Sequence, residues 1–256
     1  MQVAPLGFPL LWDIVTPNGG EDCPPSAKVR CVNLLDTLQV IPFDGRLVGG
    51  QGRFDGSITV WSKRVVQPGL LYGTKADLLE EFKCPSGTTA AFPDGRFASG
   101  GDGKVELFDL SVTPRRVLPV ITLPEPNQSV RSLAVLPTRF HHDPDLAIGL
   151  KNSLILCDSA GANVLHTFQV NSHVLCLASL PGGLLASGVG TKINLWDVFN
   201  KRFVSDLVHH TENVSSLAIL ANGCLASGCF DGTVGIWAVG DRGGNLVSVI
   251  VRIFRS

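Results

Sequence analysis

The stretch Cys224–Trp237 reads Cys-Leu-Ala-Ser-Gly-Cys-Phe-Asp-Gly-Thr-Val-Gly-Ile-Trp. Two short runs lie on either side of Asp231-Gly232, and the second run alternates and ends in an aromatic residue. Asp-Gly between two such runs is a strong hairpin signal, because both residues tolerate the positive φ of a tight turn. A third apolar run, Ala218–Leu220, precedes them and is followed by another turn pair, Asn222-Gly223. The stretch therefore predicts three short strands joined by tight turns.

Copies of this pattern recur along the chain, over 47–61, 97–109, 146–158 and 184–197, and the copy at 146–158 is the weakest. The residues that end the five copies are Trp61, Phe108, Cys157, Trp196 and Trp237, at spacings of 47, 49, 39 and 41 residues. A more polar run that predicts a fourth strand follows each copy, at 81–83, 117–123, 164–170, 203–208 and 246–254. Four strands cannot bury both faces of their sheet alone, so such units must stack side by side.

These units resemble WD40 repeats, which build β-propellers from four-stranded antiparallel blades. The resemblance covers about residues 28–254 and is strongest for the units that end at Trp196 and Trp237. Trp12-Asp13 lies 49 residues before Trp61 and is similar to the end of one more unit. The resemblance implies an all-β, WD40-type β-propeller in a single domain, 1–256. Residues 1–27 would form a partial blade and a linker rich in Pro and Gly, and 28–256 would form five repeat units.

The number of blades is left open by the sequence. WD40 propellers most often have seven blades, whereas 256 residues at about 42 residues per blade allow six at most. Three alternatives follow: an unusually small ring, an incomplete or open arc that a partner completes, and a truncated form of a longer chain. Exposed surface on an end blade would favour self-association, and the oligomeric state is not set by the sequence.

The family is known for a buried hydrogen-bond network of a His, a Ser or Thr, an Asp and a Trp within one blade. The last unit has all four at matching positions, as His210, Ser227, Asp231 and Trp237. A buried indole N–H and a buried carboxylate need polar partners, so the resemblance implies a structural role for this set. The other units keep only parts of it: Asp55 with Trp61, Ser99 with Asp102, Ser187 with Trp196, and none in the unit that ends at Cys157.

Composition argues against several classes of function. The 21 Lys and Arg residues against 22 Asp and Glu give a net charge of −1, which provides no electrostatic grip on nucleic acid or on anionic lipid. The longest apolar runs are far shorter than the roughly 18 residues of a membrane span. No Lys or Arg precedes the apolar first fifteen residues, and Asp13 interrupts them, so a secretory signal is not expected. We therefore expect an intracellular chain, in the cytoplasm with the nucleus as an alternative.

Candidate chemistry is sparse. The seven cysteines include no Cys-x-x-Cys pair, so neither a disulfide framework nor a zinc site is indicated. The stretch His141–Asp145 is the most metal-like, but adjacent histidines on an irregular loop without a regularly spaced third ligand are interpreted as a solvated loop. No set of titratable residues recurs at corresponding positions of the units, so we expect no enzyme activity, no cofactor and no metal.

Exposed aromatic residues are the better functional candidates. Phe54 and Phe230 directly precede the Asp residues of two predicted turns, at the end of the ring where WD40 proteins commonly contact partners, and Arg53 lies beside Phe54. An aromatic residue presented next to a tight turn is a suitable interface anchor. The resemblance thus implies a non-catalytic scaffold or recognition module that binds other proteins. The alternatives are a regulatory or truncated form of a longer WD40 protein and, less favoured, a propeller enzyme.

Overall fold

The computed structural model describes residues 37–40, 46–51, 57–61, 78–83, 88–112, 114–124, 127–138, 145–160, 162–240 and 243–251. Nearly all regular structure in these ranges is β-strand, and the exception is the three-residue 3-10 helix η1 (Pro181–Gly183). Across the same ranges, no helix has the length and apolar character that crossing a lipid bilayer requires.

The strands form five antiparallel sheets in chain order, here called blades 1 to 5. Blade 1 contains β1 (Thr37–Val40), β2 (Leu47–Gln51), β3 (Ser57–Trp61) and β4 (Leu78–Lys83). Blade 2 contains β5 (Thr88–Ala91), β6 (Arg96–Gly100), β7 (Lys104–Asp109), β8 (Arg116–Val117) and β9 (Ile121–Thr122). Blade 3 contains β10 (Ser132–Val135), β11 (Leu146–Gly149), β12 (Ser153–Asp158) and β13 (Asn163–Gln169). Blade 4 contains β14 (Val174–Leu180), β15 (Leu184–Val189), β16 (Lys192–Asp197) and β17 (Arg202–Val208). Blade 5 contains β18 (Val214–Ile219), β19 (Leu225–Cys229), β20 (Thr233–Gly240) and β21 (Gly243–Val251).

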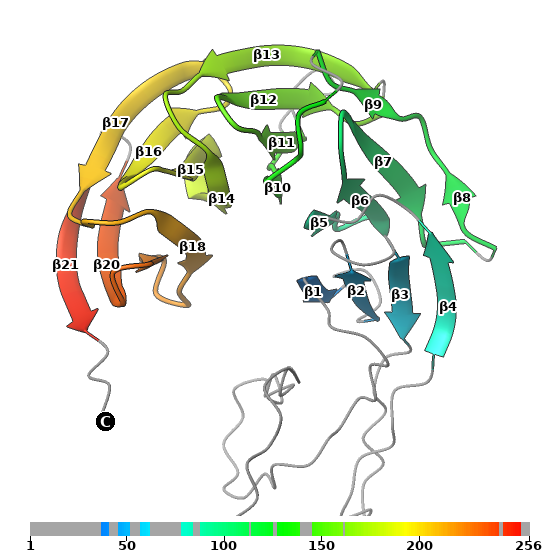
Figure 1. The fold of residues 1–256 in the computed structure, drawn as a ribbon, viewed down its shortest axis with the longest axis horizontal. Coiled ribbons are helices and arrows are strands. Elements are labelled where there is room, and N and C mark those ends of the chain that lie inside the picture. The colour runs from blue at the N-terminus through cyan, green and yellow to red at the C-terminus, as the bar shows by residue number, and fades with distance from the viewer. Residues whose placement is uncertain are drawn as a thin grey trace, which may run out of the picture.

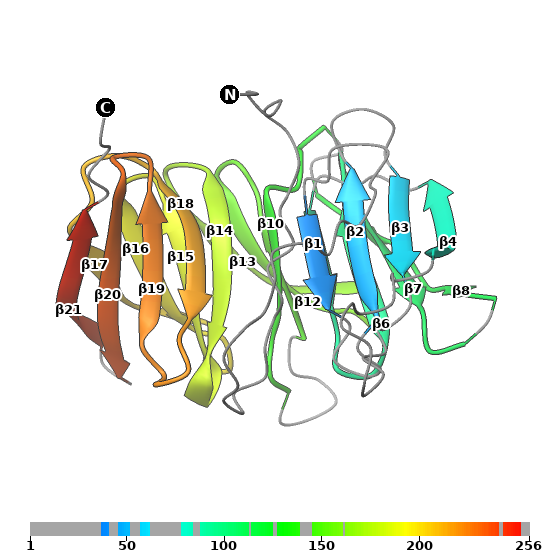
Figure 2. The ribbon, with the colours of Figure 1, turned by 90° about the horizontal axis from the view of Figure 1, so that it is seen from below.

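The blades stand side by side along an arc, with the first strand of each blade on the inside and the last on the outside (Figure 1). Seen from the side, blades 1 and 5 lie at the two ends of this arc (Figure 2). No strand pairing joins blade 1 to blade 5 within the described residues. The predicted all-β fold of five four-stranded antiparallel units is therefore confirmed. The remnant strand near Trp12 lies outside the described residues, and the division of the chain into 1–27 and 28–256 stays a prediction.

The outer strand of blade 2 differs from the expected single strand over 117–123. Instead, β8 and β9 pair separately with β7, with Val117 opposite Phe108 and Thr122 opposite Lys104. Pro119 lies between the two short strands, and its missing N–H cannot continue a ladder of hydrogen bonds. The strand predicted at 246–254 is observed as β21, which begins earlier and is described as far as Val251.

Apolar clusters between consecutive blades hold the arc together. In each blade whose closing side chain is described, that residue packs against the blade before it. Phe108 lies with Val60 of blade 1, and Trp196 lies with Leu156 of blade 3. In blades 1 to 4 the opposite face of the sheet packs on the next blade, which explains why the inner strands there are apolar on both faces. The second strand of blade 4, β15, is accordingly buried at every position.

Candidate interaction site on the last blade

The turn between β19 and β20 presents an aromatic side chain to solvent. Phe230 is 69% exposed, the highest value among the exposed large apolar residues of the described chain. Its backbone is nevertheless fixed, because its N–H donates to the carbonyl oxygen of Asn213 at 3.1 Å. Gly232 closes the turn with φ of +82° and donates to the carbonyl of Cys229 at 3.1 Å. The predicted Asp-Gly turn is thus a rigid platform beneath an exposed ring.

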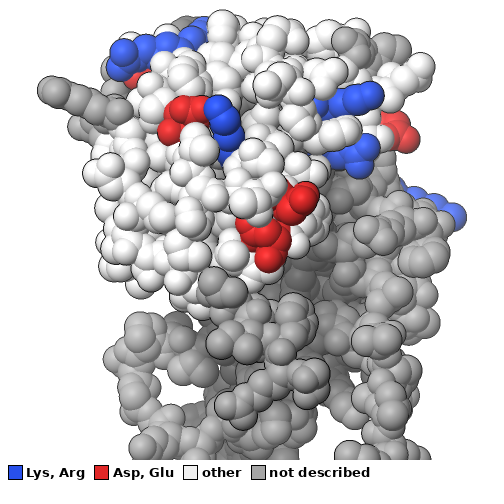
Figure 3. Space-filling model, turned by 60° about the vertical axis from the view of Figure 1, so that its left-hand side comes forward, with Lys and Arg blue, Asp and Glu red and all other residues white. Residues whose placement is uncertain are grey.

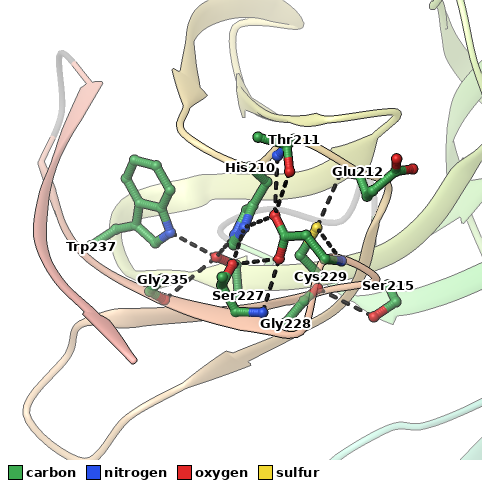
Figure 4. Close-up of polar contacts among 11 residues, drawn as sticks. His210, Thr211, Glu212, Ser215, Ser227, Gly228, Cys229, Gly235 and Trp237 are labelled. Atoms are coloured by element: carbon green, nitrogen blue, oxygen red, sulfur yellow. Dashed lines mark hydrogen bonds and ion pairs between the residues drawn. The ribbon is translucent and has the colours of Figure 1, made fainter. Parts of the chain in front are cut away.

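A buried hydrogen-bond chain lies behind this turn (Figure 4). The indole Nε1–H of Trp237 donates to Ser227 Oγ at 2.8 Å, and Ser227 Oγ lies 2.7 Å from His210 Nε2. Trp237, His210 and Ser227 are all buried, and Ser227 has no exposed surface. Three strands or loops of blade 5 are therefore tied together at one serine hydroxyl.

Asp231 joins this chain through threonines and makes no direct hydrogen bond to the imidazole. Its Oδ1 accepts from the backbone N–H of Thr233 at 2.8 Å and from the Thr233 hydroxyl at 2.5 Å. Its Oδ2 accepts from the N–H and hydroxyl of Thr211 at 3.1 and 3.2 Å. His210 Nδ1 is 3.7 Å from Asp231 Oδ2 but 3.0 Å from Thr233 Oγ1. Thr211 and Thr233 are members that the sequence reasoning did not name.

The charge states of His210 and Asp231 follow from these contacts. Burial lowers the pKa of His210, against the opposing effect of Asp231, so the imidazole is neutral. The Thr233 hydroxyl bond, with backbone bonds from Thr211 and Thr233, holds the pKa of Asp231 well below its usual range. The arrangement that satisfies every donor has Ser227 donating to Nε2 and Nδ1–H donating to Thr233. This hydrogen-bonded network therefore has a structural role and is here called the brace; its members are His210, Thr211, Ser227, Asp231, Thr233 and Trp237.

The brace predicts how the stability of the fold depends on pH. Because the folded pKa of His210 is lowered, the unfolded chain binds a proton where the folded chain does not. Stability should therefore fall as pH drops below about 6.5, the usual His value, and rise with pH through that window. Thermal melts from about pH 5 to 8 should show a flatter slope in His210→Gln than in wild type. Equal slopes in His210→Gln and wild type would contradict this role.

The same corner holds the residues that could bind a metal ion. Ligand atoms of His210, Cys229 and Asp231 all lie within 4.8 Å of one another. Each of them already has hydrogen-bond partners, and the Cys229 thiol donates to the carbonyl oxygen of Glu212 at 3.1 Å. Burial also raises the pKa of Cys229, which disfavours the thiolate that metals bind. The geometry is that of a satisfied polar network, and a cation would have to displace these bonds.

Other blades contain only parts of the brace. In blade 4, Trp196 Nε1–H donates to Ser187 Oγ at 2.8 Å, as in blade 5. Gly190, with φ of +59°, stands where blade 5 has Asp231, and the buried Nδ1 of His173 has no hydrogen-bond partner. In blade 2, Asp102 instead accepts a hydrogen bond from Ser129, a residue outside the strands. Blade 5 is the one described blade in which the whole set meets.

Of the three partner-binding candidates, one can be placed. Phe54 and Arg53 lie outside the described residues, whereas Phe230 stands exposed on the braced turn. The surface near this end of the arc is mostly uncharged, with a few acidic and basic side chains scattered over it (Figure 3).

One polar cluster was missed by the sequence reasoning. Asp145, expected in a solvated loop, is 8% exposed, and its carboxylate accepts from the N–H of Ser159 at 2.7 Å and from Arg96 Nη2 at 3.2 Å. Arg96 belongs to blade 2 and Asp145 to blade 3, so the pair ties the two blades together. The expectation for Asp145 was wrong because its backbone directly precedes the buried strand β11; His141–Pro144 lie outside the described residues. The sequence did contain a signal for this ion pair. Arg96 and Asp145 occupy equivalent positions, at the start of β6 and just before β11, and they carry opposite charges.

Residues 201–238 match the family model described as WD domain, G-beta repeat. This segment contains β17 to β19, most of β20 and the whole brace from His210 to Trp237. Residues 201–238 are thus a WD40 repeat, and this match supports the assignment of the chain to the WD40-repeat family. A comparison with curated proteins found no match. A WD40 repeat indicates a module of the protein-interaction or scaffold type, and such domains are generally non-catalytic.

Proposed function

We propose that this WD40-repeat chain is a non-catalytic recognition module within a larger protein assembly, and that it binds a protein partner around Phe230. The observation that carries the proposal is an exposed aromatic ring on a turn whose backbone is held by hydrogen bonds. Binding energy at interfaces is concentrated in a few such anchors, and rigid display lowers the entropy that association costs.

The brace explains why the anchor is held so firmly. Asp231 receives four hydrogen bonds from Thr211 and Thr233, on either side of the turn, and Ser227 ties the same region to Trp237. A loop fixed by buried polar bonds on a stack of sheets is the usual way in which a rigid scaffold presents binding residues. The same bonds occupy the titratable groups of this corner, so the arrangement does not favour acid–base or nucleophilic chemistry there.

We also propose an intracellular, cytoplasmic location, with the nucleus as the alternative. Cys157 and Cys176 are free, buried thiols, and burial raises the pKa of each to about 12. Unpaired buried thiols are stable in a reducing compartment. Fractionation of cells that express the tagged chain tests the location, and recovery in the secreted fraction would overturn it.

A quantitative pull-down from cell lysate tests the binding proposal. Phe230→Ala should lower recovery of specifically bound protein by about 10-fold, the effect expected for loss of one interface anchor. Val208→Ala is the matched control, because Val208 is 63% exposed but lies on the outer strand β17 of blade 4. This control should retain the wild-type binding profile.

Either of two results would count against the site. An unchanged profile for Phe230→Ala would remove the braced turn from the interface. Equal losses of bound protein for Phe230→Ala and Val208→Ala would indicate nonspecific binding to exposed apolar side chains rather than a specific site. Thermal melts of both variants should match wild type, since exposed positions seldom change stability by more than about 0.5 kcal/mol.

A further inference from the structure

One sheet face of blade 5 carries apolar side chains that no described blade covers. Seven residues define this open face, and none of them is charged: Ala218, Leu220, Ala226, Val234, Ile236, Val247 and Ile250. Their counterparts in blade 4 all belong to the apolar cluster between blades 4 and 5: Ala178, Leu180, Ala186, Ile193, Leu195, Val204 and Leu207. A face of this kind therefore already makes a sheet-on-sheet contact within the molecule.

Equivalent positions in the two blades show how much apolar surface the open face leaves in water. Leu180 of blade 4 is 3% exposed, whereas its counterpart Leu220 is 36% exposed. Leu207 is 3% exposed, whereas its counterpart Ile250 is 58% exposed, and Val247 on the same strand is 62% exposed. A contiguous apolar surface of this kind marks an interaction site, because covering it removes that surface from water.

The outer strand of blade 5 is uncharged along its described length. β21 spans nine residues and reads Gly-Gly-Asn-Leu-Val-Ser-Val-Ile-Val. By contrast, β4 of blade 1 contains Glu80 and Glu81, and β17 of blade 4 contains Arg202 and Asp206. Charged side chains on outer strands oppose association with other sheets. Blade 5 lacks this protection on the side where its open face ends.

The open face is large enough for a contact between two copies of the chain. The four strands of blade 5 contain between five and nine residues each. At a spacing of about 4.8 Å between strands and about 3.4 Å per residue, they form a face of about 19 by 23 Å. Two such faces bury about 900 Å² as flat planes, and the relief of the side chains raises this area toward the roughly 1,200–2,000 Å² of specific interfaces.

Side-chain size changes across the open face in a way that suits a two-fold contact. The inner strands β18 and β19 contribute Ala218 and Ala226, which lie opposite each other. The outer strands β20 and β21 contribute Ile236, Val247 and Ile250, which are branched. A two-fold axis parallel to the strands sets the outer strands of one copy over the inner strands of the other. Large side chains then meet small ones on both sides, and no like charges are brought together.

We propose that two copies of this chain associate through the open faces of blade 5 as a two-fold symmetric dimer. An uncharged sheet face of this kind resembles half of a domain core more than a transient binding surface. A second copy supplies the same uncharged face, and the two size gradients are complementary. The dimer uses a sheet face at one end of the arc (Figure 1) and does not depend on the partner proposed at Phe230.

Analytical ultracentrifugation of the purified full-length chain tests the proposal. Specific interfaces of this size have dissociation constants in the micromolar range or below, so at about 50 μM most of the wild type should sediment with twice the monomer mass. Ile250→Lys places an unpaired charge on each of the two faces and should raise the dissociation constant by about 100-fold or more. Val117→Lys is the matched control, because Val117 is 63% exposed on the outer strand β8 of blade 2, and it should dimerise as the wild type does.

Three results would overturn the proposal: a monomeric wild type at about 50 μM, equal dissociation constants for Ile250→Lys and wild type, and oligomers larger than a dimer that grow with concentration. The last of these would show a head-to-tail contact, because a two-fold contact closes at two copies. Thermal melts recorded first show which variants are folded, and Val247→Lys, at a position that is 62% exposed on the same face, serves if Ile250→Lys is not.

Photo-cross-linking between isotope-labelled and unlabelled copies locates the contact without a charged variant. Val247 is replaced by p-benzoylphenylalanine, equal amounts of the two proteins are mixed and allowed to exchange, and the irradiated products are mapped by mass spectrometry. We expect cross-links that join a labelled and an unlabelled peptide, both from 214–251. The same probe at Val117 should give several-fold fewer products between copies. Cross-links from position 247 to blade 1 of the other copy, or only to peptides of its own copy, would overturn the two-fold dimer.

Discussion

Trp237→Ala is expected to lower the free energy of unfolding by about 3–5 kcal/mol, the range for loss of a buried large aromatic side chain. Trp237 is 2% exposed and lies in the cluster that joins blades 4 and 5, with Leu195 and Leu225. The substitution also removes the indole N–H that donates a hydrogen bond to the hydroxyl of Ser227, a residue with no exposed surface. Cavity and polar effects therefore act in the same direction.

Chemical denaturation of the full chain measures this loss, and Phe230→Ala provides the control. Both substitutions remove an aromatic ring from blade 5, but Phe230 is 69% exposed and its loss should change stability by less than about 0.5 kcal/mol. Equal unfolding curves for Trp237→Ala and wild type would refute the packing of this indole. Equal losses in the two variants would show that blade 5 is sensitive to any aromatic truncation.

The five blades could be predicted because their signals are local. An Asp-Gly or Asn-Gly pair between two apolar runs specifies a hairpin without reference to the rest of the chain. The closing residue need not be Trp, as Cys157 of blade 3 shows, because the position demands an apolar side chain that packs on the preceding blade. This tolerance is why even the weakest copy, at 146–158, folds as a blade.

The contacts within the candidate site were less predictable, because they depend on which side chains meet across loops. The positions of His210 and Trp237 matched a known pattern, but the threonines that connect Asp231 to His210 carry no spacing signal of their own. The exposure of Phe230 was also undecided by sequence, since Phe108 near the end of a strand is buried and Phe230 at a turn is not. Which way a side chain points depends on the register of its strand.

The Arg96–Asp145 contact is a second example of chemistry that only the assembled blades reveal, and it leads to the other large effect. Asp145→Ala should lower the free energy of unfolding by about 3 kcal/mol, because it removes the buried partner of a cation and two hydrogen bonds of Ser159. Denaturant titration monitored by circular dichroism measures the loss.

Asp94 provides a control on the same guanidinium. Its carboxylate lies 2.7 Å from Arg96 Nε, closer than that of Asp145, yet its side chain is 54% exposed against 11% for Asp145. Solvent screening should limit the loss in Asp94→Ala to about 1 kcal/mol or less, although the distance is shorter. Asp145→Asn, which keeps an acceptor for the Ser159 N–H but removes the charge, should fall between the two. If Asp94→Ala proved as costly as Asp145→Ala, proximity rather than burial would govern this pair, and the contact would not act as the tie between blades 2 and 3.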